Sequence, residues 1–152
     1  MLGIFAAEVA GSTASYETTP PDLGEYRSRF DRVMSGPNAW LVAEVHGEVA
    51  GFAYFGSFRE RWGYRFTVEN SVYVASGFRG RGIARALMDR LIARAQAAGF
   101  RQMVAVIGDA ENRATLRLHA ACGFREVGVI REAGHKFGQW LDLVIMQRPL
   151  SG

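Results

Sequence analysis

Residues 72–84 read VYVASGFRGRGIA and join a strand-like segment to a helix-like one. The first three residues are β-branched or aromatic, which favours a β-strand. From Ile83 onward, apolar residues recur on one side of a helix until Gly99, a residue typical of the position that follows a helix. The segment therefore predicts a strand, a glycine-rich turn and the N-terminus of a long helix.

Such a turn is suited to an anionic group. Gly80 and Gly82 allow the backbone to curl so that successive N–H groups point inward. The first N–H groups of the helix have no intrahelical partners, and the helix dipole favours negative charge there. Arg79 and Arg81 add cationic donors. The turn is therefore a candidate cradle for a pyrophosphate.

Three other interpretations of the turn have to be weighed. A P-loop requires Gly-Lys-Ser/Thr after the glycines, and a dinucleotide fold requires G-x-G-x-x-G, and neither pattern is present in this turn. A strand, a glycine turn and a helix also occur together for purely structural reasons. The turn alone leaves a phosphate site and a structural turn both open.

The rest of the chain predicts further helices and strands on both sides of this unit. Asp22 and Asn112 are suited to cap helix N-termini, and Gly123 is suited to follow a helix. A short loop at 46–48 between two apolar runs predicts a β-hairpin. We expect helices at 1–12, 22–34, 83–98 and 112–122, and strands at 40–45, 49–55, 66–74, 102–107, 124–130 and 140–147.

Composition limits the architecture. A chain of 152 residues, 49% of them hydrophobic, is the size of one domain, so residues 1–152 are expected to form a single domain. No apolar stretch approaches the roughly 18 residues of a membrane span, and no leading positive charges mark a secretory signal. We therefore expect a soluble, cytoplasmic protein without membrane contact. Cys122 is the only cysteine, so the chain has no internal disulfide and no cysteine-rich metal site.

The formal net charge of +3 is compatible with an anionic ligand. The arginines between residues 79 and 94 stand among glycines and helix-forming residues. Nucleic-acid-binding domains more often interleave basic residues with exposed aromatic ones. We therefore expect a small polyphosphate ligand and no nucleic acid.

A second motif makes the chain recognisable. Residues 112–119 read NRATLRLH and lead into ACGF at 121–124. Together with RGRGIA at 79–84, they resemble the R/Q-x-x-G-x-G/A turn and the N-x-x-A/S-x-x-L-Y/H helix of the GNAT superfamily of N-acetyltransferases. Four further segments resemble the phosphinothricin and methionine sulfoximine acetyltransferases more narrowly: WLVAEV at 40–45, GEVAG at 47–51, VAVIG at 104–108 and GHKFGQW at 134–140.

The resemblance covers roughly residues 13–148. It implies an α/β fold, with a mixed and mostly antiparallel sheet flanked by helices, and a homodimer. It also implies acetyl-CoA as co-substrate, no metal, and a small amino-acid-like amine as acceptor. Family members begin with a β-strand before their first helix, so that first strand is expected to be missing here. By the same resemblance, coenzyme A would be held by Val72, Tyr73, Val74, Arg79, Gly80, Arg81, Gly82, Ile83, Ala84 and Asn112.

Acetyl transfer to an amine needs a base for the ammonium proton and an acid for the departing thiolate. Glu69 stands within an apolar strand, where an unpaired carboxylate is costly, although the pattern alone favours an exposed carboxylate or one paired with Arg65. His119 could act as base or acid near neutral pH, although a lone histidine on a helix is more often structural. The resemblance places Glu69 and His119 at the family's catalytic positions and leaves the division of labour between them open.

A free amino acid also needs a cation for its carboxylate. Arg59, Arg61 and Arg65 all lie in the loop before the strand of Glu69, and Arg65 is the closest in sequence. We expect Arg65 to bind the substrate, with a solvated loop arginine as the alternative. Two competing functions remain: acetylation of a protein N-terminus or another small amine, and a catalytically silent acyl-CoA sensor. The presence of both Glu69 and His119 argues against the sensor.

Overall fold

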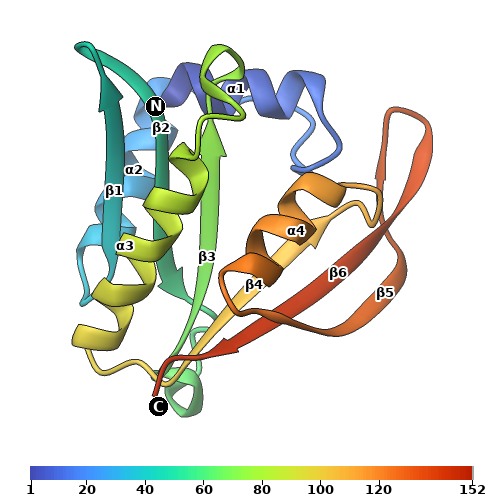
Figure 1. Cartoon of the computed structure of the whole chain (residues 1–152). Coiled ribbons are helices and arrows are strands. Elements are labelled where there is room, and N and C mark those ends of the chain that lie inside the picture. The colour runs from blue at the N-terminus through green and yellow to red at the C-terminus, as the bar shows by residue number, and fades with distance from the viewer. Residues whose placement is uncertain (152) are drawn as a thin grey trace.

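The computed structural model describes residues 1–151, and one six-stranded sheet with the order β1-β2-β3-β4-β6-β5 lies at its centre (Figure 1). The strands are β1 Ala39–Val45, β2 Glu48–Ser57, β3 Thr67–Val74, β4 Gln102–Gly108, β5 Arg125–Lys136 and β6 Gln139–Pro149. Along the same residues, the helices are α1 Leu2–Gly11, α2 Leu23–Met34, α3 Ile83–Ala97 and α4 Arg113–Ala121, with short 3-10 turns η1 Trp62–Tyr64 and η2 Ser76–Phe78.

One junction in the sheet differs from the others. Strands β3 and β4 run parallel and pair only between Thr67–Asn70 and Gln102–Ala105, whereas the other neighbouring strands pair antiparallel. Beyond these residues β3 stays bonded to β2, and β4 stays bonded to β6. Figure 1 shows the two strands diverging toward the side on which α1 lies. The sheet therefore divides into two arms, β1-β2-β3 and β4-β6-β5.

Helices cover both faces of the sheet. Successive side chains of a strand point to opposite faces. On β2, Phe52 belongs to an apolar cluster with Phe5 and Tyr26 of α1 and α2, whereas Phe55 belongs to a cluster with Met88 of α3. Helices α3 and α4 lie together on the near side of the sheet in Figure 1. We call these two sides the α1/α2 face and the α3/α4 face.

The helix ends follow the signals in the sequence. Asp22 caps α2 by accepting a hydrogen bond from the Glu25 N–H at 2.8 Å, and Asn112 caps α4 by accepting one from the Thr115 N–H at 3.3 Å. Gly123 follows α4 with a φ of 83°, a conformation that glycine adopts without strain. The expected mixed, mostly antiparallel α/β fold is confirmed.

One expectation about a particular element was wrong. Strand β5 continues past 130 to Lys136, because a register irregularity between Ile130 and Gly134 lets it resume pairing with β6. Helix α2 formed as expected and buries Tyr26, while Leu23 is 59% exposed. Helix α1 is the first element within the described residues. None of the helices in residues 1–151 is long and apolar enough to span a membrane.

Candidate active site

The glycine turn has the geometry of an anion site. Gly80 and Gly82 have φ angles of 74° and 78°, a region that other residues avoid. Gly82 is the N-cap of α3, and no side chain caps the helix there. The first intrahelical bond runs from the Ala86 N–H to the Gly82 carbonyl at 3.0 Å. The preceding N–H groups of α3 therefore have no partner within the helix and can bind an anion.

A pocket of about 440 Å³ extends from this turn into the space where β3 and β4 separate. On the β3 side, residues past Asn70 have no β4 partner, so peptide groups that would have bonded to β4 face the pocket. Such an open strand edge can bind the amides of an extended ligand. Most of the predicted site residues line the pocket: Val72, Tyr73, Val74, Arg79, Gly80, Gly82, Ile83, Ala84, Asn112 and His119.

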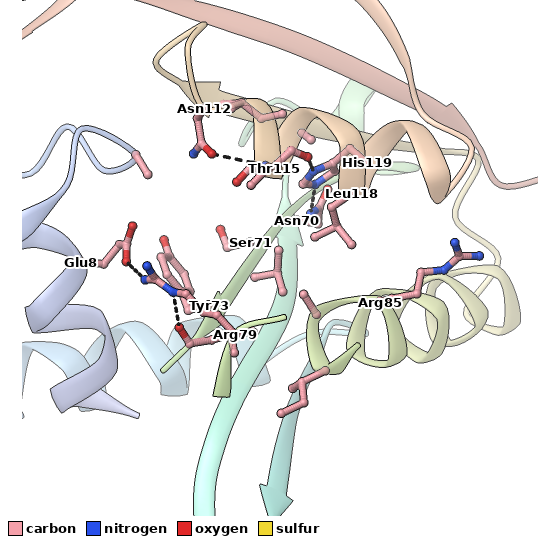
Figure 2. A pocket seen from close by; sticks show the side chains of 18 of the residues that line it. Glu8, Asn70, Ser71, Tyr73, Arg79, Arg85, Asn112, Thr115, Leu118 and His119 are labelled. Atoms are coloured by element: carbon pink, nitrogen blue, oxygen red, sulfur yellow. Dashed lines mark hydrogen bonds and ion pairs between the residues drawn. The ribbon is translucent and has the colours of Figure 1, made fainter. Parts of the chain in front are cut away.

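Arg81 and Arg79 differ in their surroundings. The Arg81 guanidinium lies 5.3 Å from the centre of the Phe78 ring, and Arg81 does not line the pocket. Arg79 lines it, donating to the Val74 carbonyl at 3.2 Å and pairing with Glu8 of α1 at 2.8 Å (Figure 2). No sequence pattern indicates Glu8, because the contact joins residues 71 positions apart.

His119 is buried on the α3/α4 face, with 2% of its surface exposed. Its Nδ1 lies 2.9 Å from the Thr115 carbonyl, which can only accept, so Nδ1 carries a proton. Its Nε2 lies 3.0 Å from Nδ2 of Asn70, which donates to it (Figure 2). Burial lowers the pKa of His119, in agreement with a neutral ring. Both ring nitrogens therefore have partners in this structure.

Glu69 lies on the opposite face from His119, because it precedes Asn70 on β3 and neighbouring side chains alternate. Its side chain is 35% exposed, and its Oε2 lies 3.9 Å from Nη1 of Arg59. Burial raises the pKa of the Glu69 carboxyl, and the nearby Arg59 charge offsets part of that rise. The structure thus places the two predicted catalytic residues on the two sides of β3, close to where β3 and β4 separate.

Arg65 is placed differently from Arg59. Its guanidinium lies over the rings of Trp62 and Phe66, at 4.8 and 4.5 Å, and donates to the Trp62 carbonyl at 3.2 Å. The ion pair with Glu69 that the sequence allowed for Arg65 is instead made by Arg59. A cation near a strand end was foreseeable, but which loop arginine turns back toward Glu69 depends on the path of the loop.

The described residues contain no group of three or more His, Cys, Asp or Glu side chains that could hold a metal ion. Cys122 is a buried free thiol within the main apolar cluster.

Comparison with known proteins gives a consistent result. The family described as "Acetyltransferase (GNAT) family" matches residues 5–124. Phosphinothricin N-acetyltransferase from Alcaligenes faecalis is 47% identical over 151 residues, which are 99% of this chain and 77% of that protein. The L-methionine sulfoximine/L-methionine sulfone acetyltransferase from Pseudomonas paraeruginosa is 40% identical over 97% of this chain and 86% of that protein.

A solved structure agrees with both relatives. The crystal structure of a GNAT superfamily phosphinothricin acetyltransferase from Sinorhizobium meliloti, in complex with acetyl-CoA, superposes with a TM-score of 0.96. The two chains are 42% identical, and the match covers 99% of this chain and 81% of the other.

Proposed function

Because this chain belongs to the acetyltransferase (GNAT) family, whose members take their acetyl group from acetyl-CoA, we propose that its acceptor is the amino group of a small amino acid. The acceptors that we propose are phosphinothricin, methionine sulfoximine and similar amino acids, which the relatives' names specify. The observation that carries this proposal is the partly buried Glu69 beside Arg59 on the face opposite His119. A base and a cation side by side suit the ammonium and carboxylate groups of one amino acid.

The α3/α4 face would hold the coenzyme. The glycine turn and the open N-terminus of α3 would bind the pyrophosphate, with Arg79 and Arg81 adding positive charge. The free edge of β3 at 72–74 would bond to the pantetheine amides, and Asn112 would add a polar contact from α4. This arrangement would direct the thioester into the space where β3 and β4 separate.

The acceptor would then approach from the α1/α2 face. Glu69 would take one proton from the ammonium group, directly or through water, and its raised pKa makes it a better base than an ordinary carboxylate. The neutral amine attacks the thioester carbonyl, so that a C–N bond forms, the C–S bond breaks, and the nitrogen gives up a second proton as it becomes the amide. The electron pair of the broken bond leaves with the sulfur as the thiolate of coenzyme A, which needs a proton.

His119 is the proposed group on the thiolate side, because it lines the coenzyme pocket. A proton on its Nε2 would need Asn70 to turn its carbonyl oxygen toward the ring. That oxygen is buried without a hydrogen-bond partner, so exchanging the amide ends would satisfy it. In this proposal Asn70 determines which protonation state of His119 is stable.

For the acceptor carboxylate we propose Arg59, which lies near Glu69, alongside the sequence-based candidate Arg65. We also propose a cytoplasmic homodimer. Support for the dimer comes from large apolar side chains exposed on the β5–β6 hairpin, with Ile130 at 49% and Trp140 at 66% exposure. Light scattering on the purified protein would test this part.

The deciding experiment measures thiol release from acetyl-CoA in the presence of different acceptors. We expect turnover with methionine sulfoximine and phosphinothricin and little with an N-terminal peptide. Turnover with the peptide alone would overturn the acceptor class while keeping the reaction. Coenzyme binding without turnover on any acceptor would indicate a silent acyl-CoA sensor.

A further inference from the structure

The buried ammonium group of Lys136 has no part in the chemistry described above. Lys136 is only 3% exposed, and its Nζ donates to the carbonyls of Val9, Ser12 and Ser15, each at 2.7 Å. A neutral amine has only two N–H groups, so three acceptors at this distance require the charged form. Within the described residues, this cation is thus bound to backbone carbonyls and to no carboxylate.

The position of Lys136 follows from the hairpin that carries it. Lys136 pairs with Gln139 across a two-residue turn, in which Phe137 and Gly138 have φ angles of 52° and 75°. The ammonium group reaches the C-terminus of α1, where Val9 supplies one of the helix carbonyls that lack an intrahelical partner. A cation is favoured at this end of a helix dipole.

Residues 12–17, which we call the strap, form the first part of the connection between α1 and α2. The Tyr16 ring packs so closely against β4 and β5 that a Cβ on Gly108 would come within 2.7 Å of it, and a Cβ on Gly134 within 2.5 Å. The Tyr16 hydroxyl donates to the Asp142 carbonyl at 3.0 Å, and Thr13 donates to Asp109. Two glycines in the motifs VAVIG and GHKFGQW therefore make room for one side chain of the strap.

These contacts connect the two arms of the sheet. Helix α1 is attached to the β3 arm by two contacts. The ring centres of Phe5 and Tyr73 lie 5.3 Å apart, and Glu8 forms an ion pair with Arg79. The strap is attached to the other arm, through Lys136 of β5 and through Tyr16. Figure 1 shows the chain after α1 reaching across to the side of α4 and the β5–β6 hairpin. Ala14 of the strap lines the pocket between the arms.

We propose that Lys136 is a positioning residue for the acceptor: by binding the carbonyls of the strap, it fixes the wall of the acceptor site across the gap between the arms. This inference rests on the proposed function, in which the amine enters from the α1/α2 face. It assigns to Lys136 a role in acceptor affinity and no contact with the reacting atoms.

The test is Lys136→Met, which keeps most of the length of the side chain and removes its three donors. We expect the acceptor KM to rise about tenfold or more, since the strap loses three charged hydrogen bonds. The affinity for acetyl-CoA should change less than about threefold, because Ala14 is the one residue of the strap that lines the coenzyme pocket. Deuterium exchange should increase at the strap amides and stay unchanged at 79–85. Unchanged exchange at the strap, or equal losses of coenzyme and acceptor affinity, would overturn the proposal.

A second variant guards against poor folding of the first. Gly134→Ala keeps Lys136 but displaces the Tyr16 ring, whereas Gly128→Ala on the same strand meets nothing within 4 Å. We expect the acceptor KM to rise in the former and not in the latter, and identical behaviour of the two variants would contradict the role of the strap. The exchange measurement needs no turnover. If the wild-type protein acetylated none of the acceptors, the proposed function would be contradicted. The contact of Lys136 with the strap would still be tested by deuterium exchange at the strap amides.

Discussion

The two faces of the sheet take their proposed site residues from the chain in different ways. On the α3/α4 face, the turn, the helix N-terminus and the open strand edge come from 72–85, and the opposing wall comes largely from 112–119. On the α1/α2 face, Arg59 comes from a loop, Glu69 from β3, and the strap is held by Lys136, more than a hundred residues away in the chain. Substitutions within 72–85 should therefore weaken coenzyme binding. Substitutions on the α1/α2 face, and at Lys136, which is distant in the chain, should impair use of the acceptor.

The largest expected effect separates chemistry from coenzyme binding. Glu69→Gln keeps the shape of the side chain and removes the base, so we expect kcat to fall by about 10²–10⁴-fold, the usual contribution of general base catalysis. Affinity for acetyl-CoA, measured by calorimetry, should stay the same because Glu69 does not line the coenzyme pocket. A matching loss of coenzyme affinity would mean that the two faces are not independent.

The next effect falls on the coenzyme face. Gly82→Val forces a β-branched residue into a φ of 78°, which costs about 1–3 kcal/mol and should weaken acetyl-CoA binding by about 10–100-fold. Gly77→Val is the matched control, since Gly77 lies in η2, has no positive φ and meets no atom within 4 Å of an added Cβ. Equal coenzyme affinities for the two variants would argue against the turn as the phosphate site.

Two arginines can be compared on the acceptor face. Arg59→Met should raise the acceptor KM about tenfold, the value of a charged hydrogen bond, with little change in coenzyme affinity. Arg65→Met should have a smaller effect, because Arg65 stacks on Trp62 and Phe66. The reverse order in steady-state kinetics would restore Arg65 as the carboxylate partner.

The smallest expected effects concern protonation. Burial raises the pKa of Glu69, so the acid side of the kcat/KM profile should lie above the ordinary glutamate range, with activity lost as Glu69 gains its proton.

A carboxyl whose pKa is higher in the folded than in the unfolded protein destabilises the folded state as pH rises past the unfolded value. Glu69→Gln should therefore raise Tm slightly at neutral pH and leave it unchanged in acid. A lowered Tm at neutral pH would contradict the burial effect.

Much of the geometry of the proposed coenzyme face could be predicted from the sequence. The glycines of the turn, the capping Asn112 and the apolar stripe of α3 act on neighbours within a few residues, and such short-range physics can be identified without a fold. The helices and strands were predicted for the same reason, since each has its own periodicity and end signals. The end of β5 was predicted too early, because the strand resumes after its register irregularity only by pairing with β6.

The arrangement of residues on the proposed acceptor face depends on the tertiary structure. The family resemblance identified Glu69 and His119 as candidates, but only the strand register put them on opposite sides of β3. Loop geometry, which short-range pattern does not determine, brought Arg59 rather than Arg65 to Glu69. The contacts of Lys136 with the strap join segments that are neighbours only after the sheet has formed, so no spacing in the sequence could have indicated them.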